Sequence, residues 1–196
     1  MHLLIGTNNP GKVLEAKDIF EGLPLELLTP EDLGIQKKPE ETGETYRENA
    51  LMKARFFQKA VNGHAVVADD SGIIVDALKN ELGVQTRRWG LGDSVSDREY
   101  IEHFIKRMKR EDVRTASFIS SVVFIDQDGN EHCFEGRVTG TITDALECDL
   151  TPGLPFDACF RPDGYDCVFG QLSLEVKNTI SHRAIAFRKV REFLLS

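Results

Sequence analysis

The stretch Ala65–Gly72 constrains the fold more than any other, because a buried-strand pattern runs directly into acidic residues. Positions 65–68 are small or β-branched apolar residues, and positions 69–72 are two aspartates, a serine and a glycine. One interpretation is a strand whose end holds a divalent cation or a water at the rim of a sheet. The other is a plain strand-ending turn, which Asp, Ser and Gly also favour. These eight residues alone leave both interpretations open.

Composition limits the classes of function. The chain has 196 residues, which fits one large domain, and its hydrophobic content of 41% and charged content of 29% are ordinary for a globular protein. Its net charge of -8 argues against a general nucleic-acid binder, which would present a basic face. A small anionic ligand remains compatible with this charge, because a few lysines and arginines can converge in one cleft.

Cysteine usage and the opening of the chain predict a cytoplasmic protein without a membrane partner. The four cysteines are Cys133, Cys148, Cys159 and Cys167, and no pair has the C-x-x-C spacing of a zinc or redox motif. We therefore expect reduced thiols. The chain opens on a strand pattern without the basic and long apolar regions of a signal peptide, and no apolar run is long enough to span a bilayer.

The first half of the sequence predicts alternating strands and helices. The predicted strands are His2–Gly6, Leu25–Thr29, Ala65–Ala68 and Ile73–Ala77, and a polar loop covers Pro30–Gly43. A first helix is predicted after Lys12, with Val13, Leu14, Ile19 and Phe20 on its apolar side. A second helix covers Thr45–Val61, where Thr45 and Glu48 form a capping box.

The second half predicts a helix, a hairpin and a final helix. The segment 80–94 is irregular and contains Arg87, Arg88 and Trp89. The predicted elements after it are a helix over Ser96–Lys109, a hairpin of Arg114–Asp126 with Glu131–Thr143, a loop over Thr151–Asp166, and a last helix opened by Ser181. Gly136 and Gly140 are predicted to mark bulges or close approaches.

Three short patterns bear on ligand binding, and the first two have a plainer alternative. Residues 7–12 join a strand to a helix start, so backbone N–H groups and Lys12 could bind a phosphate; the alternative is a polar turn with a solvated lysine. Asn49 and Lys53 share one helix face, as ligands or as solvated side chains. His182 and Arg183 occupy a first helical turn, where cations are disfavoured unless an anion lies nearby.

Taken in order along the chain, five motifs resemble those of the inosine triphosphate pyrophosphatase family. They are Thr7–Lys12, which is similar to the family's phosphate loop; Glu40–Gly43 with Glu48–Ala50 and Lys53–Ala54, similar to its acidic loop and second helix; Ala68–Gly72, similar to its metal strand; Arg88–Trp89; and Lys177–Asn178 with Ser181–Arg183. The resemblance covers nearly the whole chain.

The resemblance implies a fold, a reaction and an assembly. The fold is α/β: a long, twisted, mixed sheet with flanking helices, forming two lobes around a central cleft within a single domain, 1–196. The reaction is attack of water at the α–β phosphoanhydride of inosine, deoxyinosine or xanthosine triphosphate, which gives the monophosphate and pyrophosphate. It requires Mg²⁺. The resemblance also implies a homodimer.

The resemblance further implies roles for individual residues. Glu40, Glu41 and Asp70 would hold Mg²⁺, and Asp70, Lys12 and Lys53 would be catalytic, with Asp70 activating the water. The substrate would contact Thr7, Asn8, Asn9, Pro10, Gly11, Lys12, Asn49, Ser71, Arg88, Leu154, Pro155, Phe156, Asp157, Lys177, His182 and Arg183. Among these, His182 and Arg183 would donate to the base, which favours a 6-oxo purine over adenine.

The base pocket departs from the family's pattern, which reads G-F-G-aromatic-D-P. Here Leu154 replaces one stacking aromatic, Pro155 replaces a glycine, and Ala158 replaces a proline. Loss of one stacking face costs about 1–3 kcal/mol in base binding. Two alternatives therefore stand beside the purine-specific enzyme: a related pyrophosphatase with altered or broadened base preference, and a nucleotide-binding module without catalysis. The intact acidic set argues against the second.

Overall fold

The computed structural model describes residues 1–61, 63–79, 81–82, 84, 89 and 95–196. Most of the segment 80–94, which the sequence predicts to be irregular, lies outside the described residues. Arg88 is one of the residues outside the described ranges, so its predicted contact with the substrate stays a prediction. No helix in the described ranges is long and apolar enough to cross a membrane.

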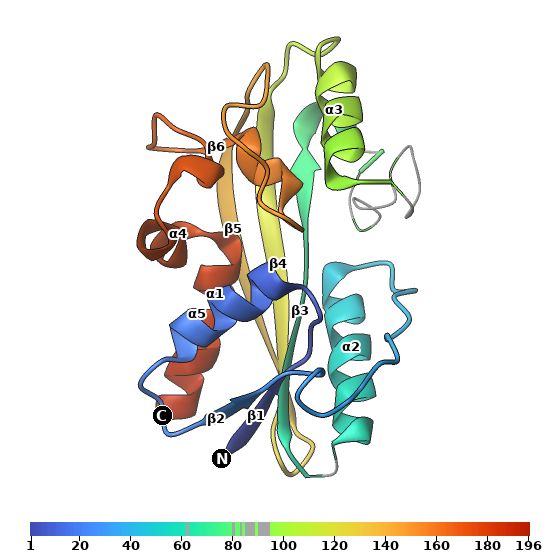
Figure 1. The fold of residues 1–196 in the computed structure, drawn as a ribbon, viewed down its shortest axis with the longest axis vertical. Helices are drawn as coiled ribbons and strands as arrows, with labels where there is room; N and C mark the ends of the chain where they lie inside the picture. Colours follow the sequence, from blue (N-terminus) through green and yellow to red (C-terminus); the bar gives the residue numbers. More distant parts are fainter. Residues whose placement is uncertain (62, 80, 83, 85–88, 90–94) are drawn as a thin grey trace.

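A six-stranded mixed sheet runs through the molecule, in the order β2-β1-β3-β4-β5-β6 (Figure 1). The strands are β1 His2–Ile5, β2 Glu26–Leu28, β3 Ala65–Val75, β4 Thr115–Ile125, β5 Glu131–Ile142 and β6 Phe160–Pro162. β1 pairs in parallel with β2 and β3, and the pairs from β3 to β6 are antiparallel. The helices are α1 Pro10–Phe20, α2 Tyr46–Ala60, α3 Asp97–Met108, α4 Leu174–Ile180 and α5 His182–Leu195. The predicted α/β class is confirmed.

β3 is one continuous strand, which overturns the strand-ending turn and corrects the strand end that the other interpretation of Ala65–Gly72 assumed. The separate strand predicted at Ile73–Ala77 is wrong, because β3 stays paired with β4 from Val66 to Val75. The residues at 69–72 each face a β4 residue, so they lie in mid-strand rather than in a turn or at the end of a strand. The long β4–β5 hairpin keeps this part of β3 extended where a turn was expected.

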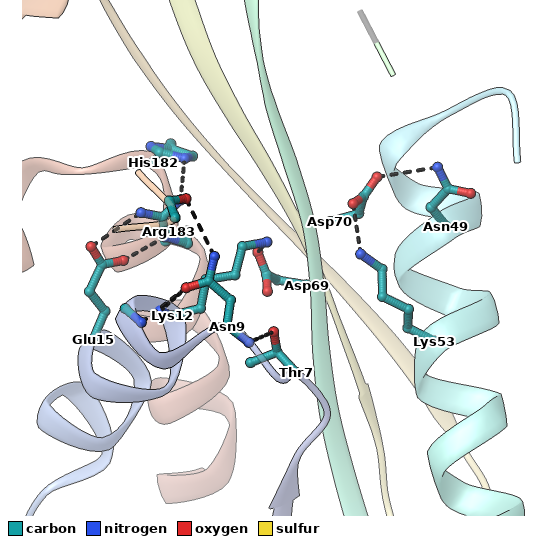
Figure 2. Close-up of polar contacts among 12 residues, drawn as sticks. Thr7, Asn9, Lys12, Glu15, Asn49, Lys53, Asp69, Asp70, His182 and Arg183 are labelled. Carbon is teal, nitrogen blue, oxygen red and sulfur yellow. Dashed lines mark hydrogen bonds and ion pairs between the residues drawn. The ribbon is translucent and has the colours of Figure 1, made fainter. Parts of the chain in front are cut away.

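The neighbouring strand β1 is much shorter than β3. Their pairing stops at Val67, where Gly6 N–H donates to the Val67 carbonyl at 2.7 Å, and the chain then leaves the sheet for α1. Beyond Val67 no described strand pairs with β3 on that side. Successive strand residues point to opposite faces, so Asp69 and Asp70 project to opposite sides of this bare edge (Figure 2).

Three apolar clusters build the core. One packs α1 and α5 on the face of the sheet that carries Phe124, and a second packs α2 on the opposite face around Val66 and Ile125. The third lies at the other end of the sheet and joins α3 to the 3₁₀ turns η3 (Pro155–Ala158) and η4 (Phe169–Gln171). In Figure 1, α2 and the pair α1–α5 lie on either side of β3.

Several local predictions are confirmed and others are wrong. The capping box of α2 is formed by Thr45 and Glu48, and Ser96 caps α3 in the same way. Leu14 was expected on the buried side of α1 but is 57% exposed. Glu15 is buried in its place, with a charged partner described below. Within the expected loop Thr151–Asp166 the structure has η3 and β6, and α4 was not predicted.

Two glycines of β5 mark close approaches, as predicted. A Cβ atom at Gly136 would collide with the backbone carbonyl of His182 and would lie 2.7 Å from the amide nitrogen of Ala186. A Cβ atom at Gly140 would collide with the backbone of Arg161 at β6. Gly136 therefore lets the first turn of α5 rest directly on the sheet.

We predict that Gly136→Ala destabilises the fold by about 1–3 kcal/mol, because the added methyl group overpacks the contact between β5 and α5. Urea unfolding measures the effect. The neighbouring Glu135→Ala, at an exposed position on the same strand, is the matched control and is expected within about 0.5 kcal/mol of the wild type. Equal unfolding midpoints for the two variants would contradict the packing described here.

Candidate active site

A cavity of about 830 Å³ lies beside the bare edge of β3, beyond the point where β1 ends. Most of the residues predicted from the sequence line it: Thr7, Asn8, Asn9, Pro10, Lys12, Glu40, Glu41, Lys53, Asp70, Ser71, Leu154, Pro155, Phe156, Asp157, His182 and Arg183. Gly11, Asn49 and Lys177 do not line it. Four of the five motifs therefore contribute residues to one cavity. In the fifth, Arg88 lies outside the described residues, and Trp89 packs against His103 and Phe104 instead.

On the α2 side of β3, Asp70 is held by two residues of one helix face. Lys53 Nζ lies 2.7 Å from Asp70 Oδ1, and Asn49 Nδ2 donates to Asp70 Oδ2 at 3.3 Å (Figure 2). Asn49 is only 2% exposed and also accepts from the Gly43 amide at 2.8 Å. Asn49 thus supports Asp70 and the acidic loop from behind the cavity wall, and its contact with the substrate stays a prediction.

The pKa of Asp70 is raised above its ordinary value. Burial at the cavity wall is the main cause, and the neighbouring Lys53 only partly offsets it. Burial acts to lower the pKa of Lys53, but Asp70, Asp69 and Glu41 outweigh it, so the pKa of that ammonium group is raised. A carboxylate with a raised pKa is a stronger base, which suits removal of a proton from water.

The acidic loop approaches the same point. Glu41 Oε1 lies 3.4 Å from Lys53 Nζ, so the carboxylates of Glu41 and Asp70 converge on one cationic group. Glu40 lines the cavity from an exposed position. Among the described residues, no three His, Cys, Asp or Glu side chains gather closely enough to form a metal cage. Mg²⁺ does not need one, because it commonly uses one or two carboxylates, its own waters and substrate phosphates.

On the opposite face of β3, Asp69 holds Lys12. Their ion pair measures 2.7 Å, and Asp69 is 2% exposed. Burial lowers the pKa of Lys12, with Lys53 and Arg183 adding to the effect and Asp69 opposing it. Sequence reasoning did not assign a role to Asp69. The sequence did carry a signal: Asp69 and Asp70 are adjacent in a strand, so their side chains must point to opposite faces and contact different partners.

The start of α1 is capped by its own sequence. Asn9 Oδ1 accepts from the amides of Gly11 and Lys12 at 3.0 and 3.3 Å, and Thr7 Oγ1 accepts from the Asn9 amide at 3.2 Å (Figure 2). These three N–H groups were predicted to bind phosphate directly, but they are already satisfied within the loop. The charge of Lys12 is therefore the main feature that this motif offers an anion.

The anion expected near His182 and Arg183 is a side chain of the protein itself. Glu15 of α1 receives two hydrogen bonds from Arg183, at 2.5 Å to Nε and 3.1 Å to Nη2, and both residues are buried (Figure 2). Lys177 Nζ lies 3.7 Å from Glu15 and 2.5 Å from Asp157. Glu15 was missed because an acid on the inner stripe of a helix gives no motif, although burying a carboxylate demands such a partner.

His182 is held as a neutral donor. Its ring stacks on Phe118 with centroids 4.6 Å apart and planes 10° from parallel. Arg183 Nη1 lies 3.1 Å from His182 Nε2, and a guanidinium group can only donate, so Nε2 accepts and the ring proton is on Nδ1. Burial, together with Arg183, Lys12 and Lys177, lowers the pKa of His182 well below its usual range. Within the described part of the chain, Nδ1 is buried and has no hydrogen-bond partner.

The loop before β6 closes this end of the cavity. Phe156 is largely buried and packs edge-on against Tyr100, Phe104 and Phe118. Leu154 lies close to Gly11 in the first turn of α1, and its aliphatic side chain lines the cavity here. Asp157 is buried beside Lys177, and this burial raises its pKa. Leu154 and His182 both line the cavity.

Comparison with known proteins gives a consistent result over the full length of the chain. A family model described as the Ham1 family matches residues 3–193. A dITP/XTP pyrophosphatase of Caldanaerobacter subterraneus subsp. tengcongensis is 34% identical over 196 residues, covering 100% of this chain and 96% of that protein. A dITP/XTP pyrophosphatase of Leptospira interrogans is 36% identical over 194 residues, covering 98% and 96%.

Solved structures agree with this match. The Ham1 protein of Staphylococcus aureus has a TM-score of 0.83 and 33% identity, covering 99% of this chain and 98% of that one. The Nucleoside-triphosphatase / dITP/XTP pyrophosphatase of Mycobacterium abscessus has a TM-score of 0.71 and 31% identity, covering 99% of each chain.

The neutral state of His182 predicts a pH dependence of stability. The folded-state pKa lies below the unfolded value of about 6.5, so the unfolded chain binds the extra proton as the pH falls. Stability is therefore complete above about pH 6.5 and is lost toward pH 5, by up to about 1.4 kcal/mol for each pH unit from this residue. His182→Gln should remove this part of the slope. Chemical unfolding of both proteins between pH 7 and pH 5 measures it, and identical slopes would contradict a neutral His182.

Proposed function

Because the chain belongs to the Ham1 family, we propose that it hydrolyses non-standard purine nucleoside triphosphates, namely inosine, deoxyinosine and xanthosine triphosphates. Water attacks the α-phosphorus, the bond to the bridging oxygen breaks, and the products are the nucleoside monophosphate and pyrophosphate. The observation that carries the proposal is the pairing of Asp70 with Lys53 on one face of β3 while His182 and Arg183 line the same cavity from the other.

The base would be selected by hydrogen-bond donors. His182 offers Nδ1–H, because Arg183 occupies its other ring nitrogen and Glu15 holds Arg183 in place. A purine with oxygen at position six presents an acceptor to such a donor. Adenine presents an amino group there, and two donors facing each other in a buried site leave both unpaired, which costs about 1–3 kcal/mol per group.

The phosphate chain would cross the bare edge of β3. Lys12 approaches it from the α1 side and Lys53 from the α2 side, so both ammonium groups can neutralise phosphate charge. Asp70 would orient the attacking water and accept its proton. Phosphoryl transfer depends mainly on such positioning and charge neutralisation, because the protein supplies no covalent step.

The residues present fit Mg²⁺ as a cofactor. Asp70 and Glu41 would hold it, since both carboxylates already meet at the ammonium group of Lys53, and Glu40 would contribute from the cavity rim. Bound there, Mg²⁺ would neutralise phosphate charge and polarise a phosphoryl oxygen. Lys53, which contacts both carboxylates, would offset part of their negative charge beside the substrate.

A homodimer and a cytoplasmic location complete the proposal. Both are implied by the resemblance to the family, and the location is also supported by the cysteines. All four, Cys133, Cys148, Cys159 and Cys167, are free thiols in the structure, as a reducing compartment would leave them.

The first test is Asp70→Asn, assayed by pyrophosphate release coupled to inorganic pyrophosphatase. We expect kcat with inosine triphosphate and Mg²⁺ to fall by roughly 10²–10⁴-fold or more, because the water loses its base. Asp112→Asn, at an exposed position that does not line the cavity, is the control and should retain wild-type turnover. Turnover retained in Asp70→Asn would remove this residue from its proposed role. Release of orthophosphate without the coupling enzyme would exclude attack at the α-phosphorus.

A second candidate is the same reaction with a broadened base preference, favoured by the aliphatic Leu154 at the cavity wall. We expect Leu154→Phe to raise kcat/KM for inosine triphosphate roughly 5-fold or more relative to a pyrimidine triphosphate, because it adds a stacking face. Leu154→Met, which adds no ring, is the control. The measurement is a panel of inosine, xanthosine, guanosine, adenosine and cytidine triphosphates. If the wild type, Leu154→Phe and Leu154→Met had equal ratios of kcat/KM between purine and pyrimidine triphosphates, Leu154 would be excluded as a determinant of base preference.

A further inference from the structure

Four cationic side chains among the described residues line the cavity, and they differ in one respect. Lys12 is paired with Asp69, Lys53 with Asp70 and Glu41, and Arg183 with Glu15. Lys38 lines the same cavity from an exposed position in the loop between β2 and α2. Within the part of the chain that the structure describes, its ammonium group makes no ion pair or hydrogen bond. Among these four described cations, Lys38 is therefore the one whose charge no described carboxylate matches.

We propose that Lys38 binds the terminal phosphate of the substrate, and later the pyrophosphate product. This inference rests on the proposed function and deepens it, because it assigns a residue to the end of the triphosphate chain. A lysine suits the role, since its ammonium group is a compact charge on a flexible stem that can follow a mobile phosphate.

The position of Lys38 follows from the contacts of its loop. Glu41 lies three residues further on and is tied to Lys53, so the backbone of Lys38 lies within about 11 Å of that of Glu41. The loop is fixed at its far end, where the Gly43 amide donates to Asn49 and the Glu44 amide donates to Glu48 at 2.7 Å. These anchors hold Lys38 on the Asp70 side of β3.

The direction of the substrate then places its terminal phosphate near Lys38. The base binds beside His182 and Phe118, on the α5 side of β3. The α-phosphorus must lie near Asp70 for attack by water. A chain that runs from the first of these points to the second continues toward the α2 side, where the loop 38–42 also lines the cavity and Glu41 contacts Lys53.

Charge balance gives the same answer. The carboxylates that face or back the cavity are paired with its three other cations, so part of the positive charge of those cations is offset before a triphosphate binds. Lys38 adds one full charge at the end where the leaving group accumulates negative charge as the bond breaks. Its neighbour Lys37 is also exposed but does not line the cavity, which provides a matched control within the same loop.

The test compares Lys38→Met, Lys37→Met and Lys38→Arg with Mg²⁺ present. In Lys38→Met we expect the KM for inosine triphosphate and the inhibition constant of pyrophosphate to rise together, roughly tenfold. The inhibition constant of inosine monophosphate should stay within twofold. Chromatography of the monophosphate formed measures inhibition by pyrophosphate, and pyrophosphate release measures inhibition by the monophosphate. Lys37→Met and Lys38→Arg should both resemble the wild type.

Three results would overturn the inference. They are no change in Lys38→Met, an equal weakening of inosine monophosphate inhibition, and an effect of Lys37→Met as large as that of Lys38→Met, which would indicate a general charge effect. If the wild type itself fails to hydrolyse inosine triphosphate, the proposed function falls and takes this inference with it. A wild type that is active beside an unaffected Lys38→Met removes only Lys38.

Discussion

The early end of β1 is the constraint on which the rest of the site depends. β3 continues for eight residues after its last paired position with β1, at Val67, and is held extended only by β4 on its other side. Had β1 continued, its backbone and side chains would fill the space where the cavity lies. Because it stops, Asp69 and Asp70 are presented at an open edge, and strand geometry sends one to each face.

Each aspartate then organises a different set of helices. Asp69 pairs with Lys12 of α1, and Glu15 of the same helix pairs with Arg183 of α5. Asp70 is held by Lys53 and Asn49 from α2. These buried ion pairs are poor evidence for net stability, because desolvation offsets much of their attraction. Their value is positional: the charged groups are oriented before the substrate arrives, so less reorganisation is needed during the reaction.

Local features of the sequence predicted much of this arrangement. The parts that were not predicted depend on contacts between residues far apart in the chain. The capping boxes at Thr45 and Ser96 depend only on neighbouring residues, and both helices begin where expected. Gly136 and Gly140 likewise sit at close approaches. Most of the candidate residues line one cavity. Lys12, His182 and Arg183 lie in the first turns of α1 and α5, whereas Lys53 and Asp70 lie within α2 and β3.

The failures share a cause. A strand continues or ends according to its neighbours, so the polar run at 69–72 could not reveal that β4 holds it in mid-strand. The inward face of α1 is set by α5, which buries Glu15 and leaves Leu14 exposed. The tautomer of His182 depends on Arg183 and on packing against Phe118, a residue 64 positions earlier in the chain. No local pattern encodes such contacts.

The most direct measurement of the central claim is a crystal structure with Mg²⁺ and an α,β-imido analogue of inosine triphosphate, which the enzyme cannot cleave between these phosphates. Our account requires the nucleotide to cross the bare edge of β3, with its base against His182 on the α5 side and its α-phosphorus beside Asp70 on the α2 side. A nucleotide lying wholly on one face of β3, or with its base in the acidic loop, would contradict it.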